Sequence, residues 1–595
     1  MLMTSSDAAL EQLIRDARQW ADEDPDPATS ATLHDLLTLA SEGDAVAAQE
    51  LGDSFSGTLQ FGTAGLRAAL GPGPNRMNRV VVRRAAAGLA AFLVDAVGAA
   101  SPGTRPRAVV GFDARHNSDI FARETAAIFA AAGIEAFLMP AALPTPILAY
   151  AVRALDCDGG VMVTASHNPP QDNGYKVYLG RHAVPESGRG AQIVAPYDAE
   201  IAAKIDAVGP LSSIVLAGDG WTVLPESIAA DYEAAVAGLV DREHFPARDL
   251  KIVLTPMHGV GGDTAVSVLK AAGFDDVTLV AEQARPDPDF PTVAFPNPEE
   301  PGALDLALAA AEELGADIVL ANDPDADRAA VAALDPATEA WRMLRGDEVG
   351  ALLGAHTVAR LAAKAGEAGK TGETAKAGDD GVEGVFANSI VSSRLLSRIA
   401  ATAGYAHQET LTGFKWISRV PGLLYGYEEA LGYCVAPDLV RDKDGISAAV
   451  LIAEMAAAAK AEGKTVFDTL DELYLVHGLH ASDQLSIRVA DLGLLDAMMN
   501  RLRVHPPEAF GGSAVEVFMD LAEGSEALPP TDGLLYLTRD QSRVIIRPSG
   551  TEPKLKCYLE VIQAVESAAE LPAARQAART SLDNVLRDVR EALGL

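Results

Sequence analysis

Cysteine is scarce in this chain. Among 595 residues there are three, Cys157, Cys434 and Cys557, and they lie far apart. An odd number of widely spaced thiols does not form the disulfide framework that is typical of small secreted proteins. We therefore expect reduced cysteines and a cytoplasmic protein.

Long apolar runs are also missing. No stretch continues without charge, glycine or proline for long enough to span a bilayer. The first residues, MLMTSSDAALEQLIRD, lack the basic start and apolar core of a signal peptide. Both absences argue against a membrane as a partner of this chain.

Basic residues are outnumbered by acidic ones. The chain has 48 Lys and Arg against 83 Asp and Glu, a formal net charge of −35. Such a surface repels nucleic acids and anionic membranes, so neither is an expected partner. One stretch is an exception, because Arg543, Arg547, Lys554 and Lys556 stand there against Glu552 alone. A locally positive loop in an acidic protein predicts a site for a small anion.

The rest of the composition is that of a large folded protein. Hydrophobic residues make up 49% and the mean hydropathy is +0.11, which excludes general disorder. A chain of 595 residues exceeds what one core usually serves, so several domains are expected. After a helical, acidic segment at 1–55, strand-like runs alternate with Ala/Leu-rich helices, which predicts an α/β fold. Strands are expected at 107–113, 160–165, 251–256, 277–282, 316–322 and 384–391, and helices near 119–132, 263–272, 303–314, 346–364 and 392–403.

Two segments depart from this alternation. The stretch 364–384 is rich in Gly, Lys and acidic residues without an apolar period, which predicts a surface insertion. From about residue 476 the pattern predicts a smaller α+β domain. Its strands are expected at 483–489, 514–520, 533–538, 542–548 and 554–561, and its helices at 491–503 and 566–593.

Ser166 opens a polar loop directly after the strand expected at 160–165. Ligands of α/β sheets bind beyond the carboxyl ends of strands, so this loop is a natural place for chemistry. The chain has no G-x-S-x-G motif and no evident Ser–His–acid triad, which argues against a hydrolase. A serine that carries a phosphoryl group needs a metal and nearby cations instead.

The loop DPDADR places Asp323, Asp325 and Asp327 at alternate positions after another strand. Alternate side chains of an extended backbone point the same way, so the three carboxylates are expected to converge. Their oxygens suit Mg²⁺, although a solvated acidic turn is the plain alternative. Arg328 follows directly and fits an anionic substrate beside a metal, while the spacing of an EF-hand is absent.

The segment IIRPSGTEPKLK predicts a phosphate site. Arg547, Ser549, Gly550 and Thr551 combine a guanidinium group, two hydroxyls and a glycine that lets backbone N–H groups approach closely. The alternative is a simple hairpin turn, because Pro-Ser-Gly favours turns in any protein. The concentration of cations favours the phosphate site.

The stretch YGYEEALGY places Glu428 beside Glu429 between aromatic and glycine residues. Adjacent carboxylates of this kind can accept hydrogen bonds from the vicinal hydroxyls of a sugar. Taken alone the pair is weak evidence, since adjacent glutamates are usually just solvated.

Five motifs occur in an order and at spacings that resemble the α-D-phosphohexomutase superfamily. They are FGTAGLR, TASHNPP, DPDADR, GYEEALGY and RPSGTEPK, and the resemblance spans roughly residues 55–560. It implies a four-domain, heart-shaped architecture with three similar α/β domains, a smaller C-terminal α+β domain and a central active-site cleft. The expected divisions are an N-terminal helical segment at 1–55, a phosphoserine domain at 56–225, a metal-binding domain at 226–345, a sugar-binding domain at 346–475 and a phosphate-binding domain at 476–595.

The resemblance also implies a role for each matching residue. Ser166 looks like the phosphoserine nucleophile, with its phosphate as a metal ligand. The other implied roles are as follows: Asp323, Asp325 and Asp327 as Mg²⁺ ligands; Arg67, His167 and Lys176 around the phosphoserine, where the proton-transfer groups are sought; Thr412, Gly413 and Lys415 as a substrate-orienting loop; Glu428 and Glu429 for sugar hydroxyls; and Arg547, Ser549, Gly550 and Thr551 for the phosphate that is not transferred. His258 is ambiguous, with a structural role in a turn favoured.

The implied activity is an intramolecular phosphotransfer on a small phosphosugar, with Mg²⁺ and a sugar bisphosphate activator, by a monomer or homodimer. The glutamate pair is followed by Ala430, Leu431 and Gly432. This form resembles the subgroup of phosphopentomutases and bacillus-type phosphoglucomutases, so hexose and pentose both stay open. The alternatives are a glucose 1,6-bisphosphate synthase, a non-catalytic phosphosugar-binding relative and a metal-dependent phosphatase. The last fits poorly, since its loop would normally begin D-x-D-x-[TV].

Overall fold

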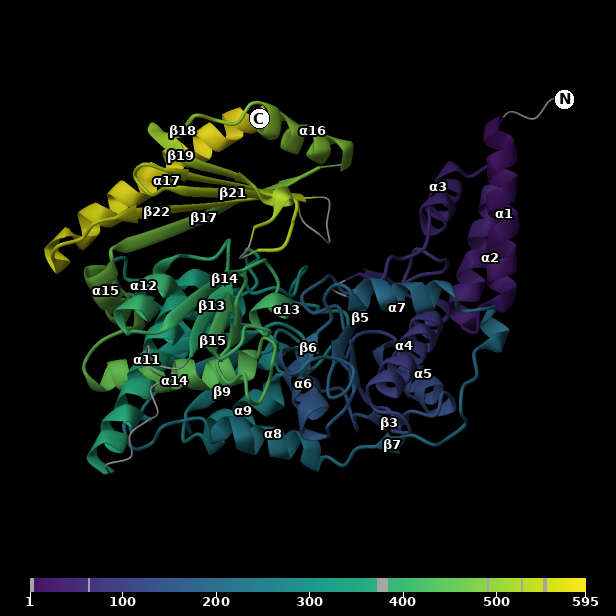
Figure 1. The fold of residues 1–595 in the computed structure, drawn as a ribbon, viewed down its shortest axis with the longest axis horizontal. Helices are drawn as coiled ribbons and strands as arrows, with labels where there is room; N and C mark the ends of the chain where they lie inside the picture. Colours follow the sequence, from purple (N-terminus) through teal and green to yellow (C-terminus); the bar gives the residue numbers. More distant parts are fainter. Residues whose placement is uncertain (1–4, 63–64, 372–383, 490–491, 526–527, 549–553) are drawn as a thin grey trace. The chain divides into compact units, whose positions relative to one another are not determined.

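The computed structural model describes residues 5–62, 65–371, 384–489, 492–525, 528–548 and 554–595 (Figure 1). The chain divides into two compact units. The first consists of residues 1–240, 249–332 and 436–453, and the second of 241–248, 333–435 and 454–595.

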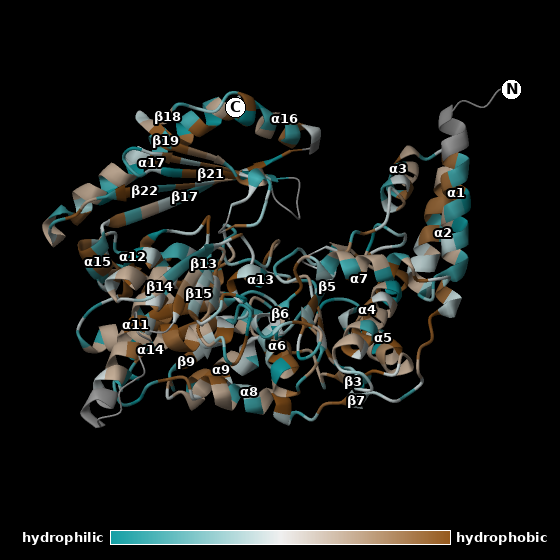
Figure 2. Cartoon of the chain, viewed as in Figure 1, coloured by the Kyte–Doolittle hydropathy of each residue, from teal (hydrophilic) through white to brown (hydrophobic). Residues whose placement is uncertain are grey.

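The first unit begins with three helices, as predicted for the N-terminal segment. They are α1 (Ser5–Glu23), α2 (Pro27–Ser41) and α3 (Ala45–Ser54). The carboxylates of Asp26 and Asp44 cap α2 and α3 by accepting backbone N–H groups of their first turns. Figure 2 shows apolar and polar stretches alternating along α1, and the apolar sides of the three helices meet in a small core that includes Leu33, Leu37 and Leu51.

A larger sheet follows, in the order β1-β5-β4-β2-β3-β7, with β6 paired to β5. Strands β2, β3, β4 and β7 are parallel, whereas β1, β5 and β6 join in antiparallel pairs. Helices α4 and α5 pack together, and their apolar residues share a core with the strands. The bounds are β1 (Leu66–Ala69), α4 (Arg79–Ala100), β2 (Arg107–Phe112), α5 (Ser118–Ala131), β3 (Glu135–Leu138), α6 (Thr145–Ala154), β4 (Gly159–Val163), β5 (Asp172–Leu179), β6 (Ala191–Gln192), α7 (Tyr197–Asp206), β7 (Thr222–Val223) and α8 (Ser227–Ala237).

The second sheet has the order β12-β11-β10-β8-β9. Strands β8, β9 and β10 are parallel, so their carboxyl ends lie at one edge. The strand expected at 277–282 ends at 279, because a 3-10 turn begins at Ala281. The bounds are β8 (Ile252–Thr255), α9 (Gly262–Ala271), β9 (Val277–Leu279), α10 (Asp305–Leu314), β10 (Ile318–Asn322), β11 (Ala329–Asp335) and β12 (Ala340–Met343).

The second unit contains a four-stranded sheet in the order β14-β13-β15-β16. The first three strands are parallel and β16 closes an antiparallel hairpin with β15. The bounds are α11 (Gly346–Thr371), β13 (Val385–Ser389), α12 (Leu395–Thr402), β14 (Ala406–Thr410), α13 (Phe414–Ile417), β15 (Leu423–Glu428), β16 (Gly432–Cys434), α14 (Gly445–Ala461), whose first half belongs to the first unit, and α15 (Val466–His477).

One expectation for this region was wrong. The helix predicted at 346–364 continues to Thr371, so the beginning of the expected insertion at 364–384 is helical. Its Ala, Lys and Glu residues have high helix propensity even where no apolar period is present. The remainder of that segment, 372–383, lies outside the described residues.

The predicted C-terminal α+β domain is confirmed. Its six strands form an antiparallel sheet in the order β17-β22-β21-β20-β19-β18. Helix α17 packs along β17 and β22 (Figure 1). The bounds are β17 (Leu479–Arg488), α16 (Leu492–Val504), β18 (Ala509–Phe510), β19 (Ser513–Asp520), β20 (Leu534–Thr538), β21 (Arg543–Pro548), β22 (Lys554–Gln563) and α17 (Leu571–Leu593). No helix in the described part of the chain is long and apolar enough to cross a membrane.

Candidate active site

Ser166 lies in the loop after β4, at the carboxyl end of a parallel strand. It is 2% exposed and has a φ of 51°, a left-handed conformation that is uncommon for any residue except glycine. Its hydroxyl donates a hydrogen bond of 2.7 Å to Oδ2 of Asp323. Nδ1 of His167 lies 3.2 Å from the same hydroxyl oxygen. The serine predicted from the motif is therefore held against the acidic loop within the first unit.

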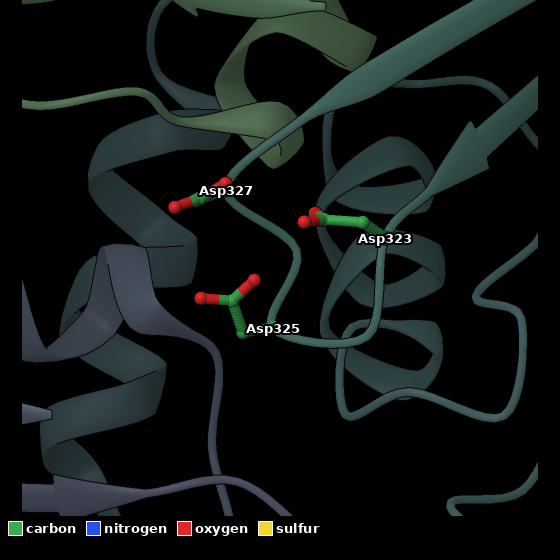
Figure 3. Close-up of side chains that lie close together, drawn as sticks. All are labelled: Asp323, Asp325 and Asp327. Atoms are coloured by element: carbon green, nitrogen blue, oxygen red, sulfur yellow. The ribbon is translucent and has the colours of Figure 1, made fainter. Parts of the chain in front are cut away.

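Asp323, Asp325 and Asp327 converge as predicted (Figure 3). They follow β10, all three are fully buried, and one ligand oxygen of each lies within 4.8 Å of the others. In the described part of the chain, Oδ1 of Asp325 and Oδ1 of Asp327 have no hydrogen-bond partner. Burial, together with the charges of Asp325 and Asp327, raises the pKa of Asp323 well above its usual value. Buried carboxylate oxygens without partners fit a hard divalent cation such as Mg²⁺.

Lys176 reaches the same carboxylates from β5. Its ammonium group donates to Oδ2 of Asp325 at 2.6 Å and to Oδ2 of Asp327 at 2.7 Å. Nζ of Lys443 lies 3.4 Å from Oδ2 of Asp327. Although burial opposes it, the two aspartates raise the pKa of Lys176, so its ammonium group stays charged. The cluster therefore brings cations and carboxylates together around Ser166.

Three further predicted residues surround this cluster. Arg67 on β1 donates from Nη1 to Oδ1 of Asn168 at 3.2 Å. Nε of Arg328 lies 3.8 Å from Oδ1 of Asp327. Burial and the charges of Arg328 and Arg67 lower the pKa of His167 well below its usual value, which favours a neutral imidazole.

Sequence reasoning missed three contributors to this site. Lys443 comes from the segment before α14, far along the chain. Thr145 donates from its hydroxyl to Oδ2 of Asp325 at 2.6 Å. Arg115 follows Asp113 at the carboxyl end of β2 and binds the backbone of the Ser166 loop. The D-x-R pattern after a predicted strand was the signal that could have identified Arg115.

The glutamate pair lies at the β15–β16 hairpin of the second unit. Glu428 is the last residue of β15, and Glu429 begins the turn. Oε2 of Glu429 accepts hydrogen bonds from the hydroxyls of Ser389 and Ser392, at 3.2 and 3.0 Å. Burial and Asp347 raise the pKa of Glu429. The pair is thus a half-buried, hydrogen-bonding site rather than a solvated turn.

Arg547 is the second-last residue of β21 in the same unit. Its guanidinium, Glu428 and Glu429 all lie near enough to Tyr558 to influence its pKa, which burial raises. Tyr558 itself belongs to a buried apolar cluster that also contains Ile390, Leu411 and Ile545. The other predicted phosphate-binding residues, Ser549, Gly550 and Thr551, lie outside the described residues.

The remaining predicted residues are those of the substrate-orienting loop and His258. Thr412 and Gly413, whose φ is 106°, lead into α13, where Lys415 is the second residue. His258 is 4% exposed, and its Nε2 lies 2.9 Å from Oγ1 of Thr292. These contacts favour the structural role in a turn for His258.

Comparison with known proteins identifies the chain. Four family models match consecutive stretches: phosphoglucomutase/phosphomannomutase α/β/α domains I, II and III at 58–208, 230–335 and 346–476, and the C-terminal domain at 499–576. A probable phosphomannomutase of Haemophilus influenzae is 45% identical and aligns over 81% of this chain and 93% of its own length. The phosphopentomutase of Homo sapiens is 35% identical over 93% and 92%.

The fold agrees with these sequence matches. The crystal structure of parafusin, a phosphoglucomutase from Paramecium, matches with a TM-score of 0.65 at 19% identity and covers 91% of this chain and 97% of that one. The architecture of three α/β domains followed by a C-terminal domain, predicted from the motifs, is confirmed. The chain is a phosphosugar mutase and belongs to the phosphoglucomutase/phosphomannomutase family.

Proposed function

We propose that the enzyme interconverts a sugar 1-phosphate and the 6-phosphate of glucose or the 5-phosphate of a pentose. The phosphoryl group passes through Ser166, and a bisphosphorylated sugar is the intermediate. The observation that carries this proposal is the buried Ser166 hydroxyl at 2.7 Å from Asp323, beside two further carboxylates and the Lys176 ammonium group.

The reaction begins with phosphorylated Ser166. The free hydroxyl of the sugar phosphate attacks the phosphorus atom, its proton leaves to a nearby base, and the bond from phosphorus to Oγ of Ser166 breaks. The bisphosphorylated sugar turns over within the site, and Oγ of Ser166 then gives up its proton and attacks the other phosphorus atom. The bond from that phosphorus to the sugar oxygen breaks, and the sugar oxygen takes up a proton as the product leaves. Nδ1 of His167 lies 3.2 Å from Oγ, which supports a place for it among the proton-transfer groups with Lys176 and Arg67.

Asp323, Asp325 and Asp327 would hold Mg²⁺ together with an oxygen of the phosphate on Ser166. When bound, the ion supplies positive charge that stabilises the phosphoryl group during transfer. Burial would raise the pKa values of Asp325 and Asp327, but Lys176 lowers them, so both carboxylates stay ionised. Arg328, next to Asp327, offers a guanidinium group to an anionic substrate.

The second unit would bind the rest of the substrate. Glu428 and Glu429 accept hydrogen bonds from sugar hydroxyls, and Arg547 with Ser549, Gly550 and Thr551 holds the phosphate that is not transferred. Thr412, Gly413 and Lys415 orient the sugar. A sugar bisphosphate of the kind that forms as the intermediate serves as the activator, because it restores the phosphate on Ser166 whenever that phosphate is lost.

Glucose and ribose phosphates are the substrates that we favour. The sequence Ala430-Leu431-Gly432 after the glutamate pair resembles phosphopentomutases and bacillus-type phosphoglucomutases. Relatives carrying the names phosphopentomutase and phosphomannomutase align over most of this chain. Mannose 1-phosphate therefore belongs in the comparison as well.

The test is a parallel assay of the wild-type enzyme on glucose, mannose and ribose 1-phosphates, with Mg²⁺ and the matching bisphosphate. Ser166→Ala should abolish turnover on every substrate, and intact mass should show a phosphate on the wild type alone. Ser54→Ala is the matched control, because Ser54 is also fully buried and its hydroxyl has no hydrogen-bond partner in the described part of the chain.

Full activity of Ser166→Ala, or a phosphate located only on another residue, would refute the proposal. Release of bisphosphate as the main product, from a separate phosphoryl donor, would instead identify a bisphosphate synthase.

A further inference from the structure

Arg115 binds four backbone carbonyl groups of the loop that carries the proposed nucleophile. Nη2 donates to the carbonyls of Ser166 and Asn168, at 2.6 and 2.5 Å. Nη1 donates to those of Pro169 and Asp172, at 2.7 and 3.1 Å. One planar guanidinium group therefore connects both ends of the turn that follows Ser166.

The backbone held in this way is strained. Ser166 has a φ of 51°, in the left-handed region where its side chain is crowded by the backbone. Such a conformation persists only where the surroundings over-determine it. Locally, the N–H of Ser166 donates to Oγ1 of Thr164 at 2.9 Å, and the four contacts from Arg115 supply further restraint.

Arg115 is itself fixed in place. Its side chain is 1% exposed, and its Nε lies 3.4 Å from Oδ2 of Asp113, which is equally buried. Oδ1 of Asp113 accepts the backbone N–H of Arg115 and the hydroxyl of Ser118. The guanidinium carbon also lies 4.9 Å from the ring centre of Phe290, which belongs to the same unit but to the neighbouring family domain. The guanidinium group is therefore held by an ion pair and by a ring contact.

We propose that Arg115 is a positioning residue for phosphoryl transfer, which fixes Ser166 in the strained conformation that aims its Oγ at Asp323. The inference rests on the proposed function, because it assigns Arg115 to the nucleophile of that reaction. Arg115 contacts only carbonyl oxygens of the loop and takes no part in bond making. Its removal lets the Ser166 backbone relax and shifts Oγ relative to the metal ligands, while substrate contacts made elsewhere persist.

The first test is Arg115→Lys, which keeps the charge but cannot bind four carbonyls with one planar fork. We expect kcat to fall by about 10- to 100-fold, since a displacement of about 1 Å at the reacting atom costs about that much. KM for the sugar phosphate should change by less than about 3-fold, because uniform substrate binding is untouched. Bisphosphate should also phosphorylate Ser166 more slowly, as followed by intact mass.

The matched control is Arg83→Lys. Arg83 is a partly buried arginine of the same domain, and among the described residues it pairs with Glu124 rather than with the Ser166 loop. Arg83→Lys should weaken the pair with Glu124 but leave kcat and the phosphorylation rate unchanged. A second variant, Asp113→Asn, removes the charge that orients Arg115 and should lower kcat by a smaller factor with the same unchanged KM.

The outcomes separate the inference from the function beneath it. An active, phosphorylated wild type with undiminished kcat in Arg115→Lys would overturn the inference alone, as would equal losses of kcat in the Arg83 control. If Arg115→Lys does not fold, undiminished kcat in Asp113→Asn would overturn the inference. A wild type without phosphate on Ser166 would refute the proposed function and the inference with it.

Discussion

The ammonium group of Lys176 lies 2.6 Å from Oδ2 of Asp325, and both side chains are buried. Lys176 belongs to β5 of the first sheet, whereas Asp325 follows β10 of the second sheet. The contact therefore joins strand β5 to the loop after β10, both of which belong to the first unit. Together with Lys443 near Asp327, it compensates part of the negative charge that three buried carboxylates bring there.

Lys176→Met should destabilise the protein most strongly when no divalent cation is present. The substitution preserves most of the side-chain volume but leaves buried carboxylates without their partner, which costs about 3–5 kcal/mol. Mg²⁺ should then raise the melting temperature of the variant more than that of the wild type, because the ion replaces charge that the variant has lost. Thermal unfolding in EDTA and in Mg²⁺ measures both effects.

Lys204→Met is the control for this prediction. Lys204 pairs with Asp95 on the surface, where both side chains are largely exposed. Its removal should change the melting temperature little and leave the response to Mg²⁺ at the wild-type level. An equal response to Mg²⁺ in the wild type and Lys176→Met would contradict the argument.

Much of the cluster around Ser166 could be predicted from local motifs in the sequence. Asp323, Asp325 and Asp327 lie within one turn after an apolar strand, so alternation alone brought them together. Ser166 and His167 could be placed by the same rule for the end of a strand. Their contact with the acidic loop, at 2.7 Å between Ser166 and Asp323, depends on the pairing of distant segments and was implied only by the family resemblance.

Strand β5 and the contacts of Lys443 and Arg115 could not be predicted from local motifs, because they depend on the pairing of segments that are distant in the sequence. Strand β5, which carries Lys176, contains Asn173-Gly174, a sequence that favours a turn. Pairing with β1 and β4 on either side overrides that preference. Lys443 stands in a loop without a recognisable motif. Arg115 has the D-x-R pattern after a strand, but that pattern does not reveal which loop the arginine binds, so the roles of both residues become visible only from their contacts.

Asp325→Asn should weaken Mg²⁺ binding at least ten-fold, about 1.4 kcal/mol, because it removes one of three converging charges at nearly constant volume. Calorimetric titration of the purified protein with Mg²⁺ measures the change. Asp95→Asn, an exposed aspartate paired with Lys204, is the control and should bind as the wild type does. Activity that persists in the wild type after complete chelation would show that the acidic loop holds no essential ion.

Glu560 on β22 connects the C-terminal sheet to the residues directly before α12, in the second unit. Its carboxylate accepts from the hydroxyl of Ser393 at 2.7 Å, from the backbone N–H of Arg394 at 2.8 Å and from Nε of Arg394 at 2.6 Å. Burial alone would raise the pKa of Glu560, but Arg543, His480 and Arg394 outweigh it and hold the pKa well below its usual value.

A lowered pKa gives this connection a defined dependence on pH. A carboxylate whose pKa is lower in the folded state stabilises the fold above its unfolded pKa of about 4.3, and this contribution is lost as the pH falls below that value. Glu560→Gln should therefore cost about 3–5 kcal/mol at pH 7, where it leaves buried cations unpaired. The difference from the wild type should shrink below about pH 4.3.

Hydrogen exchange of the peptides that contain Ser393 and Glu560, corrected for intrinsic rates, follows this connection locally. Glu516→Gln is the control, since Glu516 forms an exposed pair with Arg539. A difference between Glu560→Gln and the wild type that stays constant from pH 7 down to about pH 2 would rule out the ionised carboxylate as its source.

Arg547→Lys should raise KM for sugar monophosphates. Arginine can bind the phosphate that is not transferred through two parallel hydrogen bonds, whereas lysine keeps the charge but loses the planar fork. Because this contact acts on the ground state and the transition state alike, the first effect should be on KM, by about ten-fold for a loss of about 1.4 kcal/mol. Phosphorylation of Ser166 by bisphosphate should decline less, since Ser166 belongs to the other unit.

Steady-state kinetics measures KM, and intact mass follows the phosphorylation of Ser166. Arg539→Lys, in the exposed turn before β21, is the control. An unchanged KM with a selective loss of phosphate on Ser166 would assign Arg547 to the nucleophile instead.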